Sequence, residues 1–306
     1  MDDHTEHFGQ RAATMFEQRG PLCVGIDPHP YLMAEWGLSD SFESAARMSF
    51  RLVDALAEQV GFIKPQMAFF ERFGSRGVAL AEKVIARARS AGALVILDVK
   101  RSDMQTSLRA YAEAYLPAGA PLEADAITLS PYQGLGSLAP AIELAQEHGK
   151  GLFILALTSN PEGKEVQLAL RGDGRTVGQA VIDQTGELNA PYAPLGPLGV
   201  VIGATVGPAA TGSDQLVSES ENETDNTIPK SRETAHDLAK LRGPILVPGM
   251  GAQGGQPEDL KRVLGRAEKW SIPSYSRQIA QHGPRAADLR TAVKDLQAAY
   301  RVAPRL

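Results

Sequence analysis

The sequence lacks several features that mark large classes of protein. It has a single cysteine, Cys23, among 306 residues, so no disulfide can form within the chain and the fold must rest on its core. No stretch approaches the roughly 20 apolar residues that a membrane span needs. The first residues, MDDHTEHFGQ, are acidic and polar, whereas a secretory signal would be basic and then apolar. We therefore expect a cytoplasmic protein that does not bind a membrane.

The chain also lacks an excess of positive charge. It has 31 Lys and Arg residues against 36 Asp and Glu residues, a formal net charge of −5. This balance argues against a protein that holds nucleic acid by bulk electrostatics, although a locally basic pocket for a small molecule remains compatible with it. The six histidines are scattered without the spacing of metal ligands, so we predict no metal site.

What the chain does have is a series of short apolar runs, each bounded by Gly or Pro and without polar alternation. They lie at residues 22–26, 62–65, 93–99, 126–130, 151–157, 198–204 and 244–248. Such runs are typical of strands buried on both faces of a parallel sheet. Stretches with helical spacing separate them, at residues 43–60, 75–91, 104–116, 134–148, 174–189, 257–267 and 284–300. This alternation indicates right-handed βαβ crossovers.

An eighth strand decides between a closed barrel and an open doubly wound sheet. The candidate is WSIPSYS at 270–276, and Pro273 counts against it because proline cannot donate to a ladder. We predict a (β/α)8 TIM barrel formed by a single domain, residues 1–306, with an extra N-terminal helix at about 5–19 covering its bottom. Residues 209–233 are rich in Ser, Thr, Asn and acidic side chains, which predicts a mobile surface loop inserted in the barrel.

Charged residues recur where the predicted strands end, the edge at which α/β proteins place functional groups. Asp98 and Lys100 are two residues apart after an apolar run, so both side chains should point to one face. Buried charges are costly unless they are paired. Lys64 and Asp103 would complete an alternating row of lysines and aspartates that keeps Lys100 protonated and able to donate a proton. The alternative is a structural ion pair, with Asp103 capping a helix.

A glycine-rich segment, PGMGAQGGQP at 248–257, follows an apolar run and precedes a predicted helix. Glycines let backbone N–H groups converge on an anion, so the segment predicts a phosphate site that Arg277 could complete with a bidentate contact. A dinucleotide fingerprint is also spelled by Gly249, Gly251 and Gly254. We reject it because that fingerprint belongs on the first strand of its fold, whereas six predicted strands precede this one. A merely tight strand–helix turn remains a second interpretation.

A third polar cluster, Thr158-Ser159-Asn160-Pro161, ends the fifth predicted strand. Its hydroxyls and amide could bind the polar edge of a heterocycle. They could equally cap a turn.

Together these motifs resemble the orotidine 5′-monophosphate decarboxylase family, in its longer bacterial subgroup. The matching strings are LCVGIDPHP, FIKPQMAFFE, LDVKRSD, LTSNP, LVPGMGAQGG and SRQI, in family order from residue 21 to about 279. The resemblance implies a (β/α)8 barrel that works without a cofactor. It also implies a homodimer with shared active sites, and decarboxylation of orotidine 5′-monophosphate to uridine 5′-monophosphate in de novo pyrimidine biosynthesis.

The resemblance further implies a role for each matching residue. Lys100 would protonate C6 of the pyrimidine after CO2 leaves, Asp98 would lie against the departing carboxylate, and Lys64 would join the charged row. Asp103 would reach into the partner's site and, with Ser107, touch the ribose region; Ser107 stands where the family has threonine. The remaining residues would bind substrate: the ribose by Asp27, the pyrimidine amide edge by Ser159, and the phosphate by Gln253, Gly251, Gly254, Gly255 and Arg277.

Two other functions stay open. One is a metal-dependent phosphosugar decarboxylase or aldolase of the same superfamily, which shares the Asp-x-Lys-x-x-Asp pattern. The other is a non-catalytic sensor of nucleotide phosphates, which would need the phosphate clamp but no proton donor. The full set of Lys64, Asp98, Lys100 and Asp103 argues against the sensor.

Overall fold

Eight parallel strands close into one barrel in the computed structural model, which describes residues 6–209 and 236–301. The strands follow chain order around the barrel: β1 (Cys23–Ile26), β2 (Phe62–Pro65), β3 (Leu94–Arg101), β4 (Ala126–Leu129), β5 (Gly151–Leu157), β6 (Leu198–Ile202), β7 (Ile245–Val247) and β8 (Ser271–Tyr275). Each of the seven apolar runs contains one of them, except that β3 extends two residues beyond its run, to Arg101. The predicted (β/α)8 barrel is therefore confirmed.

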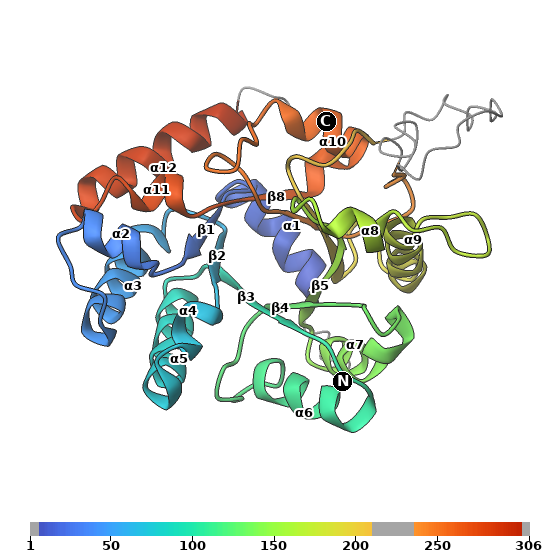
Figure 1. Ribbon diagram of the computed structural model, residues 1–306, viewed down its shortest axis with the longest axis horizontal. Helices are drawn as coiled ribbons and strands as arrows, with labels where there is room; N and C mark the ends of the chain where they lie inside the picture. Colours follow the sequence, from blue (N-terminus) through green and yellow to red (C-terminus); the bar gives the residue numbers. More distant parts are fainter. Residues whose placement is uncertain (1–5, 210–235, 302–306) are drawn as a thin grey trace.

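Helices surround the barrel and connect its strands (Figure 1). The longer ones are α1 (Phe8–Gln18), α3 (Phe42–Leu56), α5 (Gly74–Ser90), α6 (Gln105–Tyr115), α7 (Ala139–Glu147), α9 (Val177–Asn189) and α12 (Ala286–Arg301). The shorter ones are α2 (Pro30–Glu35), α4 (Ala68–Glu71), α8 (Gly163–Gln167), α10 (Asp259–Leu264) and α11 (Arg277–Ala280), with 3-10 turns η1 (Leu135–Leu138) and η3 (Gly265–Trp270). Four of them, α2, α4, α8 and α11, are missing from the prediction because they are too short to show helical periodicity.

The polar eighth strand closes the barrel despite its proline. β8 pairs with β7 through Val247 and Pro273, and with β1 through Cys23 and Ser274. Proline removes one N–H donor from the ladder, and the pairs on both sides of it are retained. Pro273 therefore weakens the strand without ending it.

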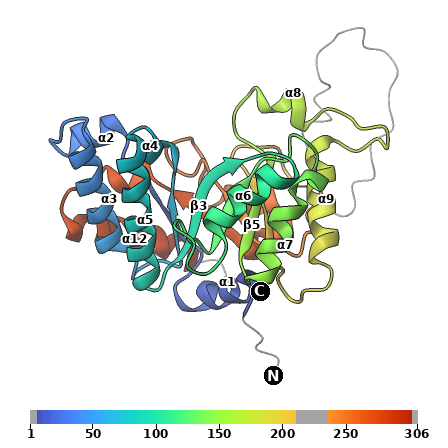
Figure 2. The same cartoon turned by 90° about the horizontal axis from the view of Figure 1, so that it is seen from below.

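Helix α1 covers the amino-terminal end of the barrel, as predicted. Figure 2 shows it below the strands, at the opposite end from α8. Phe8, Ala12 and Phe16 on one face of α1 are buried against the first residues of several strands. The ring of Phe8 meets that of Phe153 edge to face, with 5.7 Å between centroids. Since this end is filled with apolar side chains, polar chemistry is left to the carboxyl ends of the strands.

The predicted insertion at 209–233 lies outside the described residues except for Ala209. Ala209 forms a β-bridge with His236, where the description of the chain resumes. Within the two described ranges, no helix is both long enough and apolar enough to cross a lipid bilayer.

Candidate active site

The centre of the candidate site is the carboxylate of Asp98, near the end of β3, which accepts four hydrogen bonds. Its Oδ2 accepts from Lys64 Nζ at 3.1 Å and from Gln66 Nε2 at 2.9 Å. Its Oδ1 accepts from Lys100 Nζ at 2.6 Å and from Thr128 Oγ1 at 2.9 Å. Each oxygen therefore binds one ammonium and one neutral donor. We call Lys64, Asp98 and Lys100 the charged cluster.

The members of the charged cluster differ in burial. The side chains of Lys64 and Asp98 are each 8% exposed, whereas that of Lys100 is 48% exposed. Burial alone would raise the pKa of Asp98, but the charges of Lys64 and Lys100 outweigh it and hold that pKa well below its usual range. Burial would lower the pKa of Lys64, but Asp98 and Asp27 raise it above its ordinary value. Both buried groups are therefore charged at neutral pH.

A bulge in β3 brings Asp98 and Lys100 together. The register with β4 passes from Leu97 opposite Ile127 directly to Arg101 opposite Leu129. The prediction that Asp98 and Lys100 point to the same face assumed that β3 is regular. Their side chains are in contact, but at a point where β3 is irregular. Simple alternation is therefore not the reason for the contact.

Asp103 does not join the charged cluster within this chain, contrary to the predicted four-membered row. β3 ends at Arg101, and Asp103 lies in the connection to α6, where its Oδ1 accepts from the backbone N–H of Met104 at 2.8 Å. It forms no ion pair with any described residue of this chain. Ser107 is exposed on α6. Neither residue therefore contacts the charged cluster of its own chain through an ion pair or a hydrogen bond among the described residues.

Several buried polar atoms at the carboxyl ends of the strands have no hydrogen-bond partner among the described residues. They are Asp27 Oδ1 after β1, His29 Nδ1 beyond it, Ser159 Oγ after β5 and Gln278 Oε1 after β8. Buried polar atoms are nearly always paired, so a group at this mouth is available to a polar ligand. The other such atoms lie apart from it, in His7, Ser49 and Ser271.

The polar cluster that follows β5 was predicted either to bind a ligand or to cap a turn, and different residues of it fit each role. Thr158 receives the side-chain amide of Gln167 at 2.7 Å and donates to Asn160 Oδ1 at 2.6 Å, so both residues stabilise the turn into α8. The hydroxyl of Ser159 remains without a partner and lies beside Gly203 and Gly249. Capping therefore accounts for Thr158 and Asn160, while Ser159 is available to a ligand.

The glycine-rich loop after β7 is held by its own hydrogen bonds. Gly251 donates to Gly255 O at 2.7 Å, Gly254 to Gly251 O at 2.8 Å and Gly255 to Gly249 O at 3.2 Å. Gly249, Gly251 and Gly254 all have φ between +66° and +95°, the left-handed region that favours glycine. The G-x-G-x-x-G spacing, which we rejected as a dinucleotide fingerprint, thus reflects a turn requirement. The N–H groups of Gly251, Gly254 and Gly255 shape the loop instead of pointing freely at an anion.

The predicted phosphate residues lie near this loop. Gln253 is exposed on it, and Gln278 Oε1 lies against Gly251. Arg277 is exposed at the start of α11, with its guanidinium 6.0 Å from the ring centroid of Tyr31. Burial, together with the charge of Arg277, lowers the pKa of His29. The loop and the arginine thus form one polar, positively charged side of the mouth.

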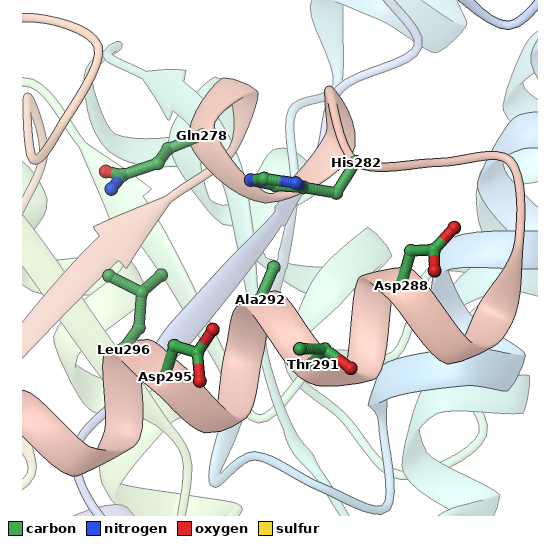
Figure 3. A pocket seen from close by; sticks show the side chains of 7 residues that line it. All are labelled: Gln278, His282, Asp288, Thr291, Ala292, Asp295 and Leu296. Carbon is green, nitrogen blue, oxygen red and sulfur yellow. The ribbon is translucent and has the colours of Figure 1, made fainter.

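A pocket of about 560 Å³ lies between α11 and α12 and shares Gln278 with the mouth (Figure 3). It is lined by Gln278, His282, Asp288, Thr291, Ala292, Asp295 and Leu296. None of these is a predicted site residue. Within the described ranges, no three His, Cys, Asp or Glu side chains gather where they could hold a metal ion.

The sequence model of the orotidine 5′-phosphate decarboxylase / HUMPS family matches residues 20–292. The chain belongs to this family. It is 49% identical over 287 residues to the orotidine 5′-phosphate decarboxylase of Streptomyces coelicolor, covering 94% of each chain. It is 48% identical to that of Salinispora arenicola, covering 97% of this chain and 98% of the other.

Solved structures related to the family agree with the barrel. A crystal structure of a Streptomyces avermitilis protein is 49% identical, with a TM-score of 0.86 over 97% of this chain and 96% of the other. The structure of Leishmania donovani OMP decarboxylase is 30% identical, with a TM-score of 0.68 over 97% and 98% of the two chains. The resemblance inferred from the motifs is therefore confirmed at the level of the family.

Two residues that contact Asp98 in this family member were not predicted from the sequence. Gln66 follows Lys64 by two positions, and Thr128 is the polar residue inside the run AITLS, between Ile127 and Leu129. A polar side chain inside an otherwise apolar run is a usable signal, because burial obliges it to find a partner. Which partner it finds depends on the register between strands, which the run itself does not reveal.

Proposed function

We propose that the chain decarboxylates orotidine 5′-monophosphate to uridine 5′-monophosphate without a cofactor, as a step of de novo pyrimidine synthesis. One observation carries the proposal: the Asp98 carboxylate lies between two ammonium groups at the barrel mouth. The buried Asp98 carboxylate keeps the half-exposed Lys100 protonated and holds its ammonium in place. A site that only binds a ligand does not need such a proton donor. Curated relatives at 47% to 49% identity over nearly the whole chain carry the name of this decarboxylase.

The chemistry requires the protein to stabilise a carbanion. When the bond between C6 and the carboxylate carbon breaks, its electron pair stays on C6 in the plane of the ring, and CO2 departs. The ammonium of Lys100 stabilises that charge and transfers a proton to C6, and the neutral amine then regains a proton from water. This interaction strengthens as charge moves from carboxylate to carbon, so it lowers the barrier and not merely the energy of the bound substrate.

The remaining residues are proposed to bind the substrate. Asp98 would lie against the departing carboxylate while Lys64 balances its charge. Asp27 would accept from a ribose hydroxyl and Ser159 would contact the pyrimidine amide edge, since both have buried oxygens without a partner. The phosphate would be bound by Arg277 and Gln253, together with the loop shaped by Gly251, Gly254 and Gly255.

We propose a homodimer in which Asp103 and Ser107 contribute to the partner's site. Support comes from the exposed apolar side chains near them, Met104 at 59%, Tyr111 at 40% and Tyr132 at 81% exposure, which a second copy could cover. The single thiol, Cys23, is unpaired, which suits the reducing cytoplasm where we propose that the enzyme works.

The test is to incubate the protein with orotidine 5′-monophosphate and a chelator and to follow the ultraviolet absorbance of the substrate. We expect the absorbance to fall at the same rate with and without chelator. Loss of activity with chelator would favour the metal-dependent phosphosugar enzymes. Binding of the nucleotide without any change in absorbance would favour the sensor.

A further inference from the structure

Thr128 on β4 lies opposite the bulge of β3. Between the pairs Leu97–Ile127 and Arg101–Leu129, residues 98–100 of β3 face this single residue of β4. Thr128 is 1% exposed, so water has little access to the groups it contacts. A bulge disrupts the regular ladder, and its backbone donors then need other acceptors.

The side-chain oxygen of Thr128 meets that need. Its Oγ1 accepts from the backbone N–H of Val99 at 3.0 Å and from that of Lys100 at 2.9 Å, and it lies 2.9 Å from Asp98 Oδ1. The two N–H groups can only donate, and the charged carboxylate can only accept. The hydroxyl hydrogen must therefore point to Asp98, so all three hydrogen bonds have a fixed direction.

The same contacts hold Lys100 in an unusual backbone conformation. Its φ is +43°, in the left-handed region, where a side chain other than glycine persists only if its surroundings determine it. Thr128 binds the backbone of Lys100 at one end, while Asp98 Oδ1 binds both the Thr128 hydroxyl and the ammonium of Lys100. The Thr128 hydroxyl thus fixes the backbone of Lys100 and also the Asp98 carboxylate, which in turn binds the Lys100 ammonium.

We infer that Thr128 is a positioning residue for the proton donor, acting through the Asp98 carboxylate and the Lys100 backbone. The inference rests on the proposed decarboxylase function. It concerns a residue that does not itself have to touch the nucleotide. Loss of the hydroxyl should therefore reduce the chemical step and leave nucleotide affinity nearly unchanged, because the phosphate and ribose contacts are proposed to come from other strands.

The experiment compares Thr128→Val, which keeps the shape, with Thr128→Ser, which keeps the hydroxyl. Thr185→Val is the matched control: Thr185 is equally buried, and its hydroxyl donates to Val181 O at 2.7 Å within α9. A displaced reacting group can cost on the order of 100-fold, so Thr128→Val should lower kcat about that much with KM changed less than about threefold. Thr128→Ser should stay within about fivefold of the wild-type kcat, and Thr185→Val should lower the melting temperature but not kcat.

Two results would overturn the inference alone: wild-type kcat in Thr128→Val, or a Thr128→Ser variant as slow as Thr128→Val. If Thr128→Val does not fold, Thr128→Ala supplies the variant without a hydroxyl and must show the same split between kcat and KM. A wild-type protein without any decarboxylation would overturn the proposed function as well. The wild-type assay therefore separates the two failures.

Discussion

Nζ of Lys100 lies 2.6 Å from Oδ1 of Asp98, while Nζ of Lys64 contacts the other oxygen of the same carboxylate at 3.1 Å. The two ammonium groups are not equivalent. The side chain of Lys64 is 8% exposed and that of Lys100 is 48% exposed. A buried ammonium can balance the carboxylate, whereas only the half-exposed one can be reached by a substrate entering the mouth. This difference makes Lys100 the better candidate for the proton donor.

Replacing Lys100 by alanine should abolish turnover and leave nucleotide binding largely intact. General acid catalysis contributes about 10²–10⁴-fold on its own, and the same ammonium also stabilises the carbanion, so the loss of kcat should reach at least about 10⁴-fold. The measurements are kcat for orotidine 5′-monophosphate and the affinity for uridine 5′-monophosphate. Lys83→Ala, at an exposed site on α5, is the matched control and should behave as wild type. Near-wild-type turnover of Lys100→Ala would refute the donor role.

Replacing Asp98 by asparagine should destabilise the fold because it leaves the ammonium of Lys64 buried without its main counter-charge. Breaking a buried pair from one side costs about 3–5 kcal/mol, whereas removing both charges is often nearly neutral. In chemical denaturation, Asp98→Asn should therefore be less stable than the double variant Lys64→Met/Asp98→Asn. Both should be inactive. A double variant that is less stable than the single one would show that the cluster contributes net stability through its charges.

The thiol of Cys23 should be inert in the folded protein. Cys23 is fully buried at the start of β1, and burial raises the pKa of its thiol to about 12. A thiol reagent at pH 8 should label it only after unfolding, measured as the absorbance of the released chromophore. Labelling of the native protein at the rate of the unfolded chain would contradict this burial.

The same thiol should make stability depend on pH. In the unfolded chain the thiol ionises near pH 8.5. Below that pH the thiol is protonated in both states, so its full contribution to the free energy of unfolding is present. As pH rises from there towards 12, only the unfolded state loses its proton, and the stability of the wild type should fall relative to Cys23→Ala by up to about 1.4 kcal/mol per pH unit. Urea titrations of both proteins at pH 7, 8, 9 and 10 measure the difference. A constant difference across this range would contradict the raised pKa.

The barrel could be predicted because strands buried on both faces leave continuous apolar runs, and because glycines and prolines bound each run. β8 was the hardest strand to predict, since Ser271, Pro273 and Ser274 interrupt its apolar character although all three are buried. Neighbouring strands on both sides compensate for those residues. The pairing of β8 with both β7 and β1 exists only in the closed barrel, so the sequence of residues 270–276 does not reveal it.

The charged cluster could be predicted only in part. The identities of Lys64, Asp98 and Lys100 were accessible from their places at strand ends, but the bulge that joins them was not. The bulge depends on the register between β3 and β4, and therefore so does the contact that Thr128 makes. The position of Asp103 outside the charged cluster of its own chain has the same origin, because the residue at which β3 ends determines where that side chain lies.

The glycine loop offers a test that separates backbone strain from loss of binding. Gly251 has φ +66°, and an added Cβ would lie 1.7 Å from Gln278 Oε1, whereas Gly37 has φ +71° with nothing within 4 Å of an added Cβ. Both alanine variants therefore carry similar backbone strain, about 1 kcal/mol or more of stability. Only Gly251→Ala should displace the loop that is proposed to bind phosphate, so its KM should rise at least about tenfold while kcat changes less, since remote binding contacts contribute mainly to affinity. Equal KM values for Gly37→Ala and Gly251→Ala would show that this loop does not bind the substrate.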